Sequence, residues 1–458
     1  MVIEQDYNTY INKLDGCLKK YIPPYDTWNP VDKALYEPKD LYRIPLKEAE
    51  ELQFKSIKFA FNHHYSNNKF YQSFCKENKV FPDDIKTSGD LSKIPIIPDG
   101  FFKDYPSGKE FAAWLGNIYT GDLPEIVIKH SSPTYDQVID AFNDAGLAVT
   151  YSSGTSGRHT FVPRDQRTFF LSEYAIAKSV VSMIYPLWDN NMSGYLLMPN
   201  PYKTNIYAGK VCSVYFDAIR DVSVAIDREI TTELIKLTMG GGKGLKSKMI
   251  RFFSKRTSQK MIEDIIKWIE HHEKTKEKIV FVGAPYILYF VMEKLKKQGR
   301  SFDFDGRGVV GTGGGWKIHE TIRLSAADFR KEVNEVLGIP ERYCIDIYGM
   351  VEGNGWMVQC PEGHYLHVPY SYYKPIVLDD EFEQVGYGES GRFAFLDSAA
   401  LSYPGFITTG DKVKLLEHCP VCDRPGPVLE PEVKRVVGTE MRGCAEEMRS
   451  MMTRDIGR

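Results

Sequence analysis

Residues 151–157 are Tyr151-Ser152-Ser153-Gly154-Thr155-Ser156-Gly157, and only Thr150 separates them from the apolar residues Leu147, Ala148 and Val149. After its first residue, this stretch contains only serine, threonine and glycine. Glycine allows the backbone to come close to an anion, and hydroxyl and amide groups donate hydrogen bonds to it. The stretch therefore predicts a phosphate-binding loop that follows a β-strand.

The predicted loop differs from a Walker nucleotide loop. Gly157 is followed by Arg158, His159 and Thr160 rather than by a lysine and a hydroxyl residue. A surface turn is the other interpretation of such a stretch when it stands alone. Two later motifs favour phosphate binding. They are Tyr348-Gly349-Met350-Val351-Glu352, after the apolar residues 345–347, and Thr408-Thr409-Gly410-Asp411, after residues 403–407.

The order of these three motifs resembles the adenylate-forming superfamily of acyl-CoA synthetases. Further motifs are similar to the acyl-protein synthetase family of bacterial bioluminescence, namely residues 94–98 with Phe101-Phe102-Lys103, Arg164-Asp165, and Arg442-Gly443-Cys444. The resemblance extends from about Pro45 onward. It implies an ATP-dependent enzyme that activates a fatty acid as an acyl-adenylate and takes the acyl group onto its own cysteine.

Apolar patterning divides the chain into a mainly helical part and an alternating part. A helical stripe in residues 52–65 predicts a helix before residue 144. From residue 148 onward, short apolar runs alternate with helical windows, which is typical of an α/β fold. The predicted strands are 194–198, 211–216, 278–282 and 308–310, and a helix is predicted over 286–296.

The resemblance implies an α/β adenylate-forming large domain of layered β-sheets and helices, with a truncated C-terminal lid. The expected divisions are a mainly helical N-terminal part (1–145), an α/β adenylate-forming core (146–411) and a short C-terminal segment (412–458). A mobile lid of about a hundred residues does not fit into that last segment. We expect this truncation to distinguish an acyl-protein synthetase from a complete CoA ligase.

Adenylation of a carboxylate requires a positioned triphosphate, a cation and a firm grip on adenosine. By the resemblance, Arg158 or Arg164 supplies the positive charge that related loops take from a lysine. Glu352 is the expected Mg²⁺ ligand, because this ion prefers oxygen donors. The residues expected to hold the β- and γ-phosphates are Ser152, Ser153, Gly154, Thr155, Ser156 and Gly157.

The remaining predicted contacts are with the adenosine. Tyr348, followed by Gly349, is expected near the adenine. Asp411 is expected to accept hydrogen bonds from both ribose hydroxyls, a task that suits a carboxylate with two oxygens. Gly313 and Gly314 belong to a glycine run that would let the backbone lie against the adenine or the acyl chain. As an isolated run, these glycines are equally consistent with a flexible turn.

A second group of residues has the spacing of a metal site. Cys419-Pro420-Val421-Cys422 forms a knuckle, and residues 360–367 offer Cys360, His364 and His367 as further ligands of a tetrahedral Zn²⁺. Resemblance to phenylacetate-CoA ligases favours His367 over His364. Two turns with incidental cysteines are the alternative. Four protein ligands would leave no open position, so we expect a structural zinc.

Cys444 is the expected acyl acceptor because its place near the end of the chain matches that of the acylated cysteine in the resembled family. Arg442 beside it would favour the thiolate by electrostatic attraction. A single cysteine near a terminus is usually inert, so this role depends on the resemblance. Cys344, close to Tyr348, is the next candidate nucleophile.

Composition places further limits on function. The 458 residues carry a net charge of −3, which is not the basic footprint of a nucleic-acid-binding protein. The basic run 243–260 is expected to be a solvated loop. No apolar run approaches the roughly 20 residues of a membrane span, and the N-terminus lacks a secretory signal. We therefore expect a cytoplasmic protein whose eight cysteines are thiols, ligands or nucleophiles.

The sequence thus predicts an acid-thiol ligase that uses ATP and Mg²⁺, with a long-chain fatty acid as substrate and an acyl reductase as the partner that receives the acyl group. Two alternatives remain open at this point. The first is a phenylacetate-type ligase that uses free CoA. The second is a non-catalytic, nucleotide-binding protein stapled by zinc.

Overall fold

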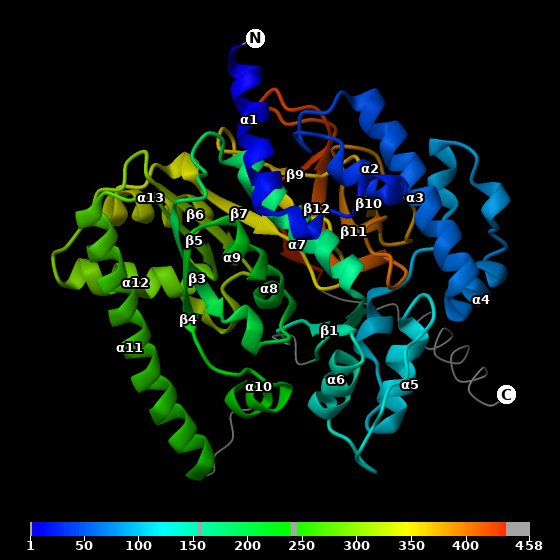
Figure 1. Cartoon of the computed structure of the whole chain (residues 1–458), viewed down its shortest axis with the longest axis horizontal. Coiled ribbons are helices and arrows are strands. Elements are labelled where there is room, and N and C mark those ends of the chain that lie inside the picture. Colours follow the sequence, from blue (N-terminus) through cyan, green and yellow to red (C-terminus); the bar gives the residue numbers. More distant parts are fainter. Residues whose placement is uncertain (1, 154–157, 240–244, 437–458) are drawn as a thin grey trace.

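The computed structural model describes residues 2–153, 158–239 and 245–436. Its first part is helical, and the helix predicted over residues 52–65 is confirmed because it lies within α3. The helices of this part are α1 (Val2–Cys17), α2 (Pro30–Tyr36), α3 (Leu46–Asn67), α4 (Lys69–Glu77), α5 (Lys109–Ile118) and α6 (Tyr135–Asp144). Figure 1 shows α3 and α4 on one side of the molecule, away from the long helix α11 (Leu245–Thr275).

A parallel half-sheet forms the centre of the fold, in the order β4-β3-β5-β6-β7. Its strands confirm three of the four predicted strands, those at 194–198, 278–282 and 308–310. The strands are β3 (Ser193–Pro199), β4 (Asp221–Ile226), β5 (Ile279–Gly283), β6 (Gly308–Gly313) and β7 (Cys344–Tyr348).

Alternate residues of this half-sheet are buried on opposite faces. On β5, Ile279 and Phe281 belong to one hydrophobic cluster, whereas Val280 and Val282 belong to the other. The first cluster contains side chains of α11, α12 (Pro285–Lys297) and α13 (Ala326–Leu337), and the second contains side chains of α7 (Gln166–Met183). Such a two-sided covering by helices is the expected environment of parallel strands.

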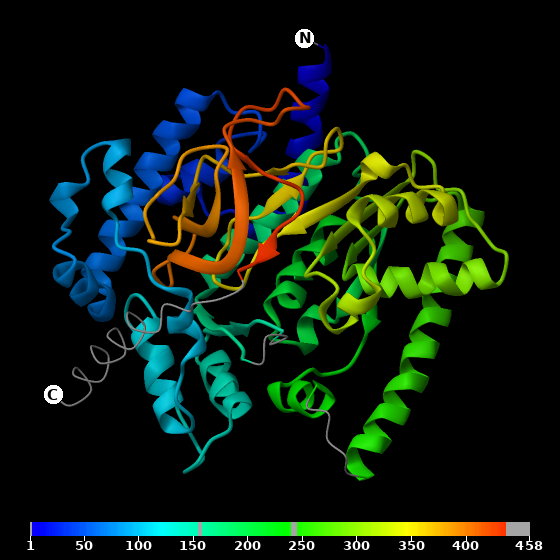
Figure 2. The same ribbon diagram turned by 180° about the vertical axis from the view of Figure 1, so that it is seen from behind.

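The same sheet continues as an antiparallel half, in the order β7-β8-β9-β13-β12-β11-β10, and β14 also pairs with β12. Figure 2 shows these strands from behind, coloured yellow to red. They are β8 (Met357–Gln359), β9 (Leu366–His367), β10 (Tyr373–Leu378), β11 (Ser390–Asp397), β12 (Phe406–Leu416), β13 (Val428–Leu429) and β14 (Lys434–Arg435). The predicted domain boundary after residue 411 falls within β12.

A separate antiparallel hairpin, β1 (Ala148–Tyr151) and β2 (Phe161–Arg164), flanks the predicted phosphate loop. The remaining α-helices are α8 (Tyr207–Lys210), α9 (Tyr215–Ala218) and α10 (Thr232–Met239). Short 3₁₀ helices are η1 (Lys19–Tyr21), η2 (Tyr25–Thr27), η3 (Pro82–Asp84), η4 (Ser88–Lys93), η5 (Asp99–Lys103), η6 (Pro201–Lys203), η7 (Val211–Val214), η8 (Lys317–Ile322) and η9 (Glu341–Tyr343). None of the helices in the described ranges has the length and apolarity needed to cross a bilayer.

The strand predicted over residues 211–216 is wrong, because η7 and α9 occupy this segment. Val211, Val214 and Tyr215 of this segment are buried, as is Ala218 just after it, and these residues have the i, i+3, i+4, i+7 spacing of a helix face. A short apolar run does not by itself distinguish a strand from a buried helical turn.

The loop predicted for the basic run 243–260 is also wrong from residue 245 onward, where α11 begins; residues 243–244 lie outside the described residues. Lysine, arginine, leucine and methionine are good helix formers, so a basic run is compatible with a helix. Further along α11, Ile265, Ile266 and Ile269 are buried in the hydrophobic cluster with Phe281. This packing anchors the helix to the sheet.

Candidate active site

The two motifs that end β7 and lie on β12 meet at one place. Tyr348 is the last residue of β7, at the carboxyl end of the parallel half-sheet, where ligands of open α/β sheets commonly bind. Its hydroxyl donates a hydrogen bond to Oδ2 of Asp411 at 2.7 Å. The Tyr-Gly-x-x-Glu and Thr-Gly-Asp motifs therefore form one site.

Asp411 is buried, and each of its carboxylate oxygens has a partner. Oδ2 accepts the Tyr348 hydroxyl, and Oδ1 lies 3.0 Å from Nη1 of Arg435. Arg435 is brought there by the pairing of β14 with β12, in which Asp411 lies opposite Arg435. The Arg435 side chain is largely exposed, whereas that of Asp411 is not. The motif spacing gave no signal for Arg435, because this contact depends on strand pairing.

Tyr348 is a dependable donor in this pair. Burial and the adjacent Asp411 carboxylate raise the pKa of Tyr348 well above its usual value, so the phenol stays protonated. Its ring lies 6.0 Å from that of Phe393, at an angle of 54°. Gly349 next to it is required by packing, since a Cβ there would lie 2.5 Å from the Trp356 ring.

Glu352 lies on the turn after β7, close to three other polar groups. Burial raises the pKa of its carboxyl, while a hydrogen bond with the Thr160 side chain and the charge of Lys103 act in the opposite direction. The nearby Asp411 carboxylate raises the pKa further. A half-buried carboxyl group near a second carboxylate is an environment that a divalent cation would stabilise.

Lys103 supplies a positive charge to this site, although it lies outside the three predicted nucleotide-binding motifs. It ends η5, and its Nζ lies 3.0 Å from Oδ2 of Asp99. The backbone N–H of Asp99 donates to the Thr408 hydroxyl at 3.2 Å, which fixes η5 beside the Thr-Gly-Asp motif. A Cβ on Gly410 would lie 3.9 Å from Lys103 Nζ. The buried Phe101 and Phe102 anchor the same short helix.

The ends of the predicted phosphate loop are held together by hydrogen bonds. The N–H of Ser152 donates to the Thr160 carbonyl at 3.0 Å, and the N–H of Thr160 donates to the Ser152 hydroxyl at 2.9 Å. The His159 ring Nδ1 lies 2.7 Å from the Ser152 carbonyl oxygen. Ser153 follows on the described side of the loop. The predicted phosphate contacts Gly154, Thr155, Ser156 and Gly157 lie outside the described residues.

The two candidate arginines occupy different environments. Arg158 is largely exposed; its Nη1 donates to the Lys103 carbonyl at 3.4 Å and lies 3.5 Å from Oδ1 of Asp104. Arg164 is fully buried, and its guanidinium is bound by four protein acceptors. Arg164 is therefore not available to a phosphate, whereas the Arg158 side chain is largely exposed.

Glycine is favoured for a different reason at each of two positions in the glycine run that begins at the end of β6. Gly313 lies opposite Ile347 in the β6–β7 pairing, and a Cβ on it would lie 3.1 Å from the Ile347 carbonyl oxygen. Gly314 has a φ of 75°, which favours glycine over other residues. Gly313 thus lies beside β7, at the strand end that carries Tyr348.

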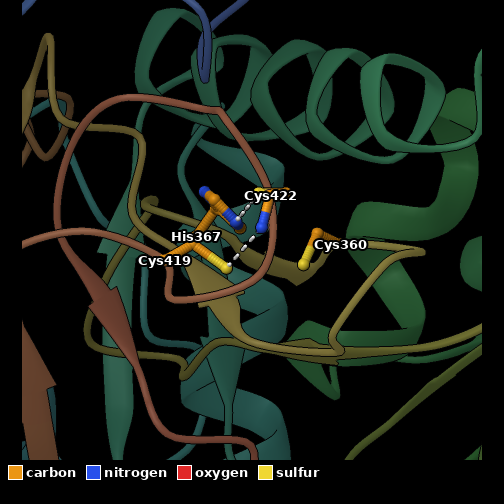
Figure 3. A group of neighbouring side chains, drawn as sticks. All are labelled: Cys360, His367, Cys419 and Cys422. Atoms are coloured by element: carbon orange, nitrogen blue, oxygen red, sulfur yellow. Dashed lines mark hydrogen bonds between the residues drawn. The ribbon is translucent and has the colours of Figure 1, made fainter.

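The predicted metal ligands form a compact group (Figure 3), in which the ligand atoms of Cys360, His367, Cys419 and Cys422 all lie within 4.8 Å of one another. Cys360 follows β8, His367 ends β9, and the two other cysteines precede β13. Because β9 pairs with both β8 and β13, the sheet brings these ligands together. The Cys422 Sγ lies 3.3 Å from His367 Nε2.

His364 lies outside this group of four. Its backbone has a φ of 58°, in the left-handed region, and burial lowers the pKa of its ring to about 4. Three thiols and one imidazole are the donors that a tetrahedral zinc site uses. The cluster within the described residues therefore fits Zn²⁺ through His367.

Of the two candidate acyl acceptors, the structure describes only Cys344. Cys444 lies outside the described residues. Cys344, the reserve candidate, is 2 % exposed on β7, and burial raises the pKa of its thiol to about 12. A buried thiol with a raised pKa is a poor nucleophile, so Cys344 is poorly suited to accept the acyl group.

Comparison with known proteins assigns the chain to a family. A family model described as "Acyl-protein synthetase, LuxE" matches residues 31–131 and 222–453. The chain belongs to the acyl-protein synthetase (LuxE) family. This assignment confirms the resemblance inferred from the three motifs and from Phe101-Phe102-Lys103.

Two relatives of this chain are each named long-chain-fatty-acid–luciferin-component ligase. The protein from Vibrio harveyi is 25 % identical over 413 residues, which cover 89 % of this chain and 90 % of that protein. The protein from Aliivibrio fischeri is 23 % identical over 416 residues, which cover 90 % of this chain and 91 % of that protein.

Solved structures of 2-hydroxyisobutyryl-CoA ligase are similar to this chain in fold. The complex with R3-HIB-AMP in the postadenylation state has a TM-score of 0.57 at 12 % identity, covering 86 % of this chain and 69 % of that one. The open conformation with 2-HIB-AMP and CoA has a TM-score of 0.57 at 13 % identity, covering 90 % and 79 %. At such identities the likeness shows the fold alone, and it confirms the predicted α/β adenylate-forming architecture.

Proposed function

We propose that this acyl-protein synthetase uses ATP to activate a long-chain fatty acid as an acyl-adenylate and then transfers the acyl group to a cysteine thiol. The observation that carries the proposal is the convergence of Tyr348, Glu352 and Asp411 beside Lys103 at the carboxyl end of the parallel half-sheet. The names of the Vibrio harveyi and Aliivibrio fischeri relatives support a long-chain fatty acid as the substrate.

The proposed first step is an in-line displacement at the α-phosphorus of ATP. An oxygen of the fatty-acid carboxylate forms a bond to this phosphorus, and the bond to the pyrophosphate oxygen breaks. Asp411 holds the ribose through its carboxylate oxygens, and Tyr348 fixes the orientation of that carboxylate. The loop 152–157 holds the β- and γ-phosphates, with positive charge from Lys103 and Arg158 near its ends.

Mg²⁺ fits the carboxyl group of Glu352, because this half-buried carboxyl lies near Asp411 and would be stabilised by a cation. When bound, the ion would neutralise the charge that develops on the phosphate oxygens. The Thr160 side chain forms a hydrogen bond with Glu352 and so orients its carboxyl group.

In the proposed second step, the Cys444 thiolate attacks the acyl carbonyl carbon, a thioester forms, and AMP leaves with its electron pair. Covalent capture divides one difficult transfer into two activated steps. An acyl reductase is the proposed partner that then receives the acyl group from this cysteine.

We propose further that Cys360, His367, Cys419 and Cys422 hold a structural Zn²⁺. The support is the donor set and the 4.8 Å spread of the ligand atoms. A zinc held by all four residues would connect β8, β9 and the segment before β13. Such a site would stabilise the fold rather than take part in acyl transfer.

Intact-mass measurement after incubation with ATP, Mg²⁺ and a panel of fatty acids tests the proposed function. Pyrophosphate release together with a mass increase equal to one acyl group is the expected result. Pyrophosphate release without acylation, followed by thioester formation on added CoA, would show a CoA ligase instead. No pyrophosphate release with any acid, despite ATP binding, would show a nucleotide-binding protein without adenylating activity.

A further inference from the structure

A fully buried arginine side chain contacts the loop that carries Glu352. Arg164, at the end of β2, is 0 % exposed. Its Nη2 donates to the Val351 carbonyl at 2.5 Å, and its Nε donates to Oδ1 of Asn354 at 3.1 Å. The guanidinium thus contacts the residue before Glu352 and a residue shortly after it.

Two buried tyrosines complete this support of the loop. The Tyr403 hydroxyl accepts a hydrogen bond from Arg164 Nη2 at 2.9 Å and donates to the Glu352 carbonyl at 3.1 Å. The Tyr207 hydroxyl donates to the Gly353 carbonyl at 2.9 Å. The guanidinium carbon lies 4.2 Å from the Tyr207 ring centre and 5.1 Å from that of Tyr403. Three consecutive carbonyls, those of residues 351–353, are therefore bound by side chains from outside the loop.

Arg164 also connects this loop to the hairpin that flanks the phosphate loop. Its Nη1 donates to the Thr150 hydroxyl on β1 at 2.7 Å, and Arg164 itself ends β2. The strand residues on both sides of the phosphate loop are thus tied, through one side chain, to the turn that carries Glu352. The planar guanidinium suits this task, because its donors have fixed relative directions.

The energetic cost of this arrangement argues against a mere packing role. All four acceptors of Arg164 are uncharged oxygens, and burying a charge without a directly paired opposite charge is costly. Asp397 lies on the other side of Asn354 and accepts its backbone N–H at 2.5 Å. Apolar side chains of similar volume would fill such a space at lower cost. They would not bind the carbonyls of residues 351–353.

We propose that Arg164 and Tyr403 are positioning residues that hold the Glu352 carboxylate at a fixed place relative to the phosphate loop, in the orientation that binds the Mg²⁺ of the Mg²⁺·ATP complex. This inference rests on the proposed function of Glu352. According to this inference, Arg164 and Tyr403 affect the rate of adenylation and the Mg²⁺ dependence of that rate. Neither residue contacts ATP in this account.

A double-mutant cycle between Tyr403 and Glu352 tests the proposal. Tyr403→Phe keeps the ring and removes only the hydroxyl that joins Arg164 to the Glu352 carbonyl. We expect it to lower ATP–pyrophosphate exchange by about tenfold, the effect of losing roughly one hydrogen bond from the transition state. It should also raise the Mg²⁺ concentration for half-maximal exchange and leave the KM for the fatty acid unchanged. In a Glu352→Gln background, Tyr403→Phe should have no further effect, because coupled residues are not additive.

The matched control is Tyr215→Phe. Within the described residues, the Tyr215 hydroxyl is buried without a hydrogen-bond partner, and it lies on α9 outside this network. This variant should leave the rate and the Mg²⁺ dependence unchanged. If Tyr403→Phe does not fold, as judged by thermal denaturation, Tyr207→Phe replaces it, since it removes the bond to the Gly353 carbonyl.

Each outcome bears on one proposal or on both. Equal effects of Tyr403→Phe in the wild-type and Glu352→Gln backgrounds would overturn the positioning role and leave the proposed function intact. Normal exchange and Mg²⁺ dependence in Tyr403→Phe would do the same. Normal exchange in Glu352→Gln would overturn the proposed role of Glu352 and this inference with it, while leaving adenylation intact. No exchange in the wild-type protein with any acid would overturn the proposed function and the inference together. No further effect of Tyr403→Phe in the Glu352→Gln background, together with a raised Mg²⁺ requirement of Tyr403→Phe in the wild-type background, supports both.

Discussion

The Tyr348 hydroxyl lies 2.7 Å from Oδ2 of Asp411, although 63 residues separate the two in the chain. The contact joins the end of β7 to the long strand β12, which lies in the antiparallel half of the sheet. Because the tyrosine stays protonated, it always donates, and the Asp411 carboxylate keeps one orientation. One motif therefore orients the functional group of the other.

Tyr348→Phe should impair ATP binding more than the chemical step. Removing the hydroxyl frees Asp411 to rotate, so we expect the KM for ATP to rise by about tenfold, the equivalent of roughly one hydrogen bond. The kcat for pyrophosphate exchange should change less. Steady-state kinetics at varied ATP would show this, with the exposed Tyr202→Phe as control. A lowered kcat with an unchanged KM would mean that Tyr348 acts on the reacting groups instead.

Glu352→Gln should lower pyrophosphate exchange by a factor on the order of a hundred, as expected for the loss of one electrostatic stabiliser. Burial raises the pKa of Glu352, so the wild-type rate should fall as the pH decreases through that raised pKa and the carboxylate becomes protonated. The Gln variant should lack this acidic limb. It should also melt at a higher temperature near neutral pH, because a half-buried charge is removed. Glu381→Gln, at an exposed position, should change none of these quantities.

Lys103 and Arg158 can be separated as sources of positive charge. Lys103 lies near Glu352 and Gly410, whereas Arg158 is largely exposed and pairs with Asp104. We expect Lys103→Met to lower pyrophosphate exchange by about tenfold to a hundredfold and Arg158→Met to lower it less, since a charge closer to the reacting phosphate stabilises more. The opposite order in the same exchange assay would assign the phosphate charge to Arg158.

Cys419→Ser and Cys422→Ser should each reduce bound zinc and lower the melting temperature. A structural zinc contributes folding free energy directly, so loss of one ligand should cost stability at all substrate concentrations. Metal analysis and thermal denaturation measure the two effects. Cys17→Ser, outside the cluster, is the control and should change neither. Purified wild-type protein without zinc would contradict the proposed metal site.

Cys444→Ser should abolish covalent acylation and leave adenylation intact, because adenylation uses no thiol. A chain that ends at Val437 should behave in the same way. Intact mass and pyrophosphate release distinguish the two steps. Hydroxylamine-labile acylation of the shortened chain would place the nucleophile elsewhere, and among the described cysteines the buried Cys344 is a poor substitute.

Local sequence was informative wherever a local pattern has one physical solution. The stripe in residues 52–65 predicted the helix found within α3, and the apolar runs at 194–198, 278–282 and 308–310 predicted β3, β5 and β6. It failed at residues 211–216, where an apolar run fits either a strand or a buried helical face. It also failed at the basic run 243–260, which was predicted to be a loop but is helical from residue 245 onward, because basic residues are compatible with a helix as well as with a loop.

By itself, the sequence determined the chemistry available to this protein: the hydroxyl and glycine loop, the carboxylates Glu352 and Asp411, and the cysteine spacing of the metal cluster. Only the tertiary structure decided how these groups are used. Strand pairing placed Arg435 against Asp411 and His367, rather than His364, among the three thiols. Burial turned Arg164 from a candidate phosphate ligand into an internal support of the Glu352 loop. The reason is physical: a side chain's charge and donors are local properties, whereas its solvent exposure and partners depend on chain segments far away in sequence.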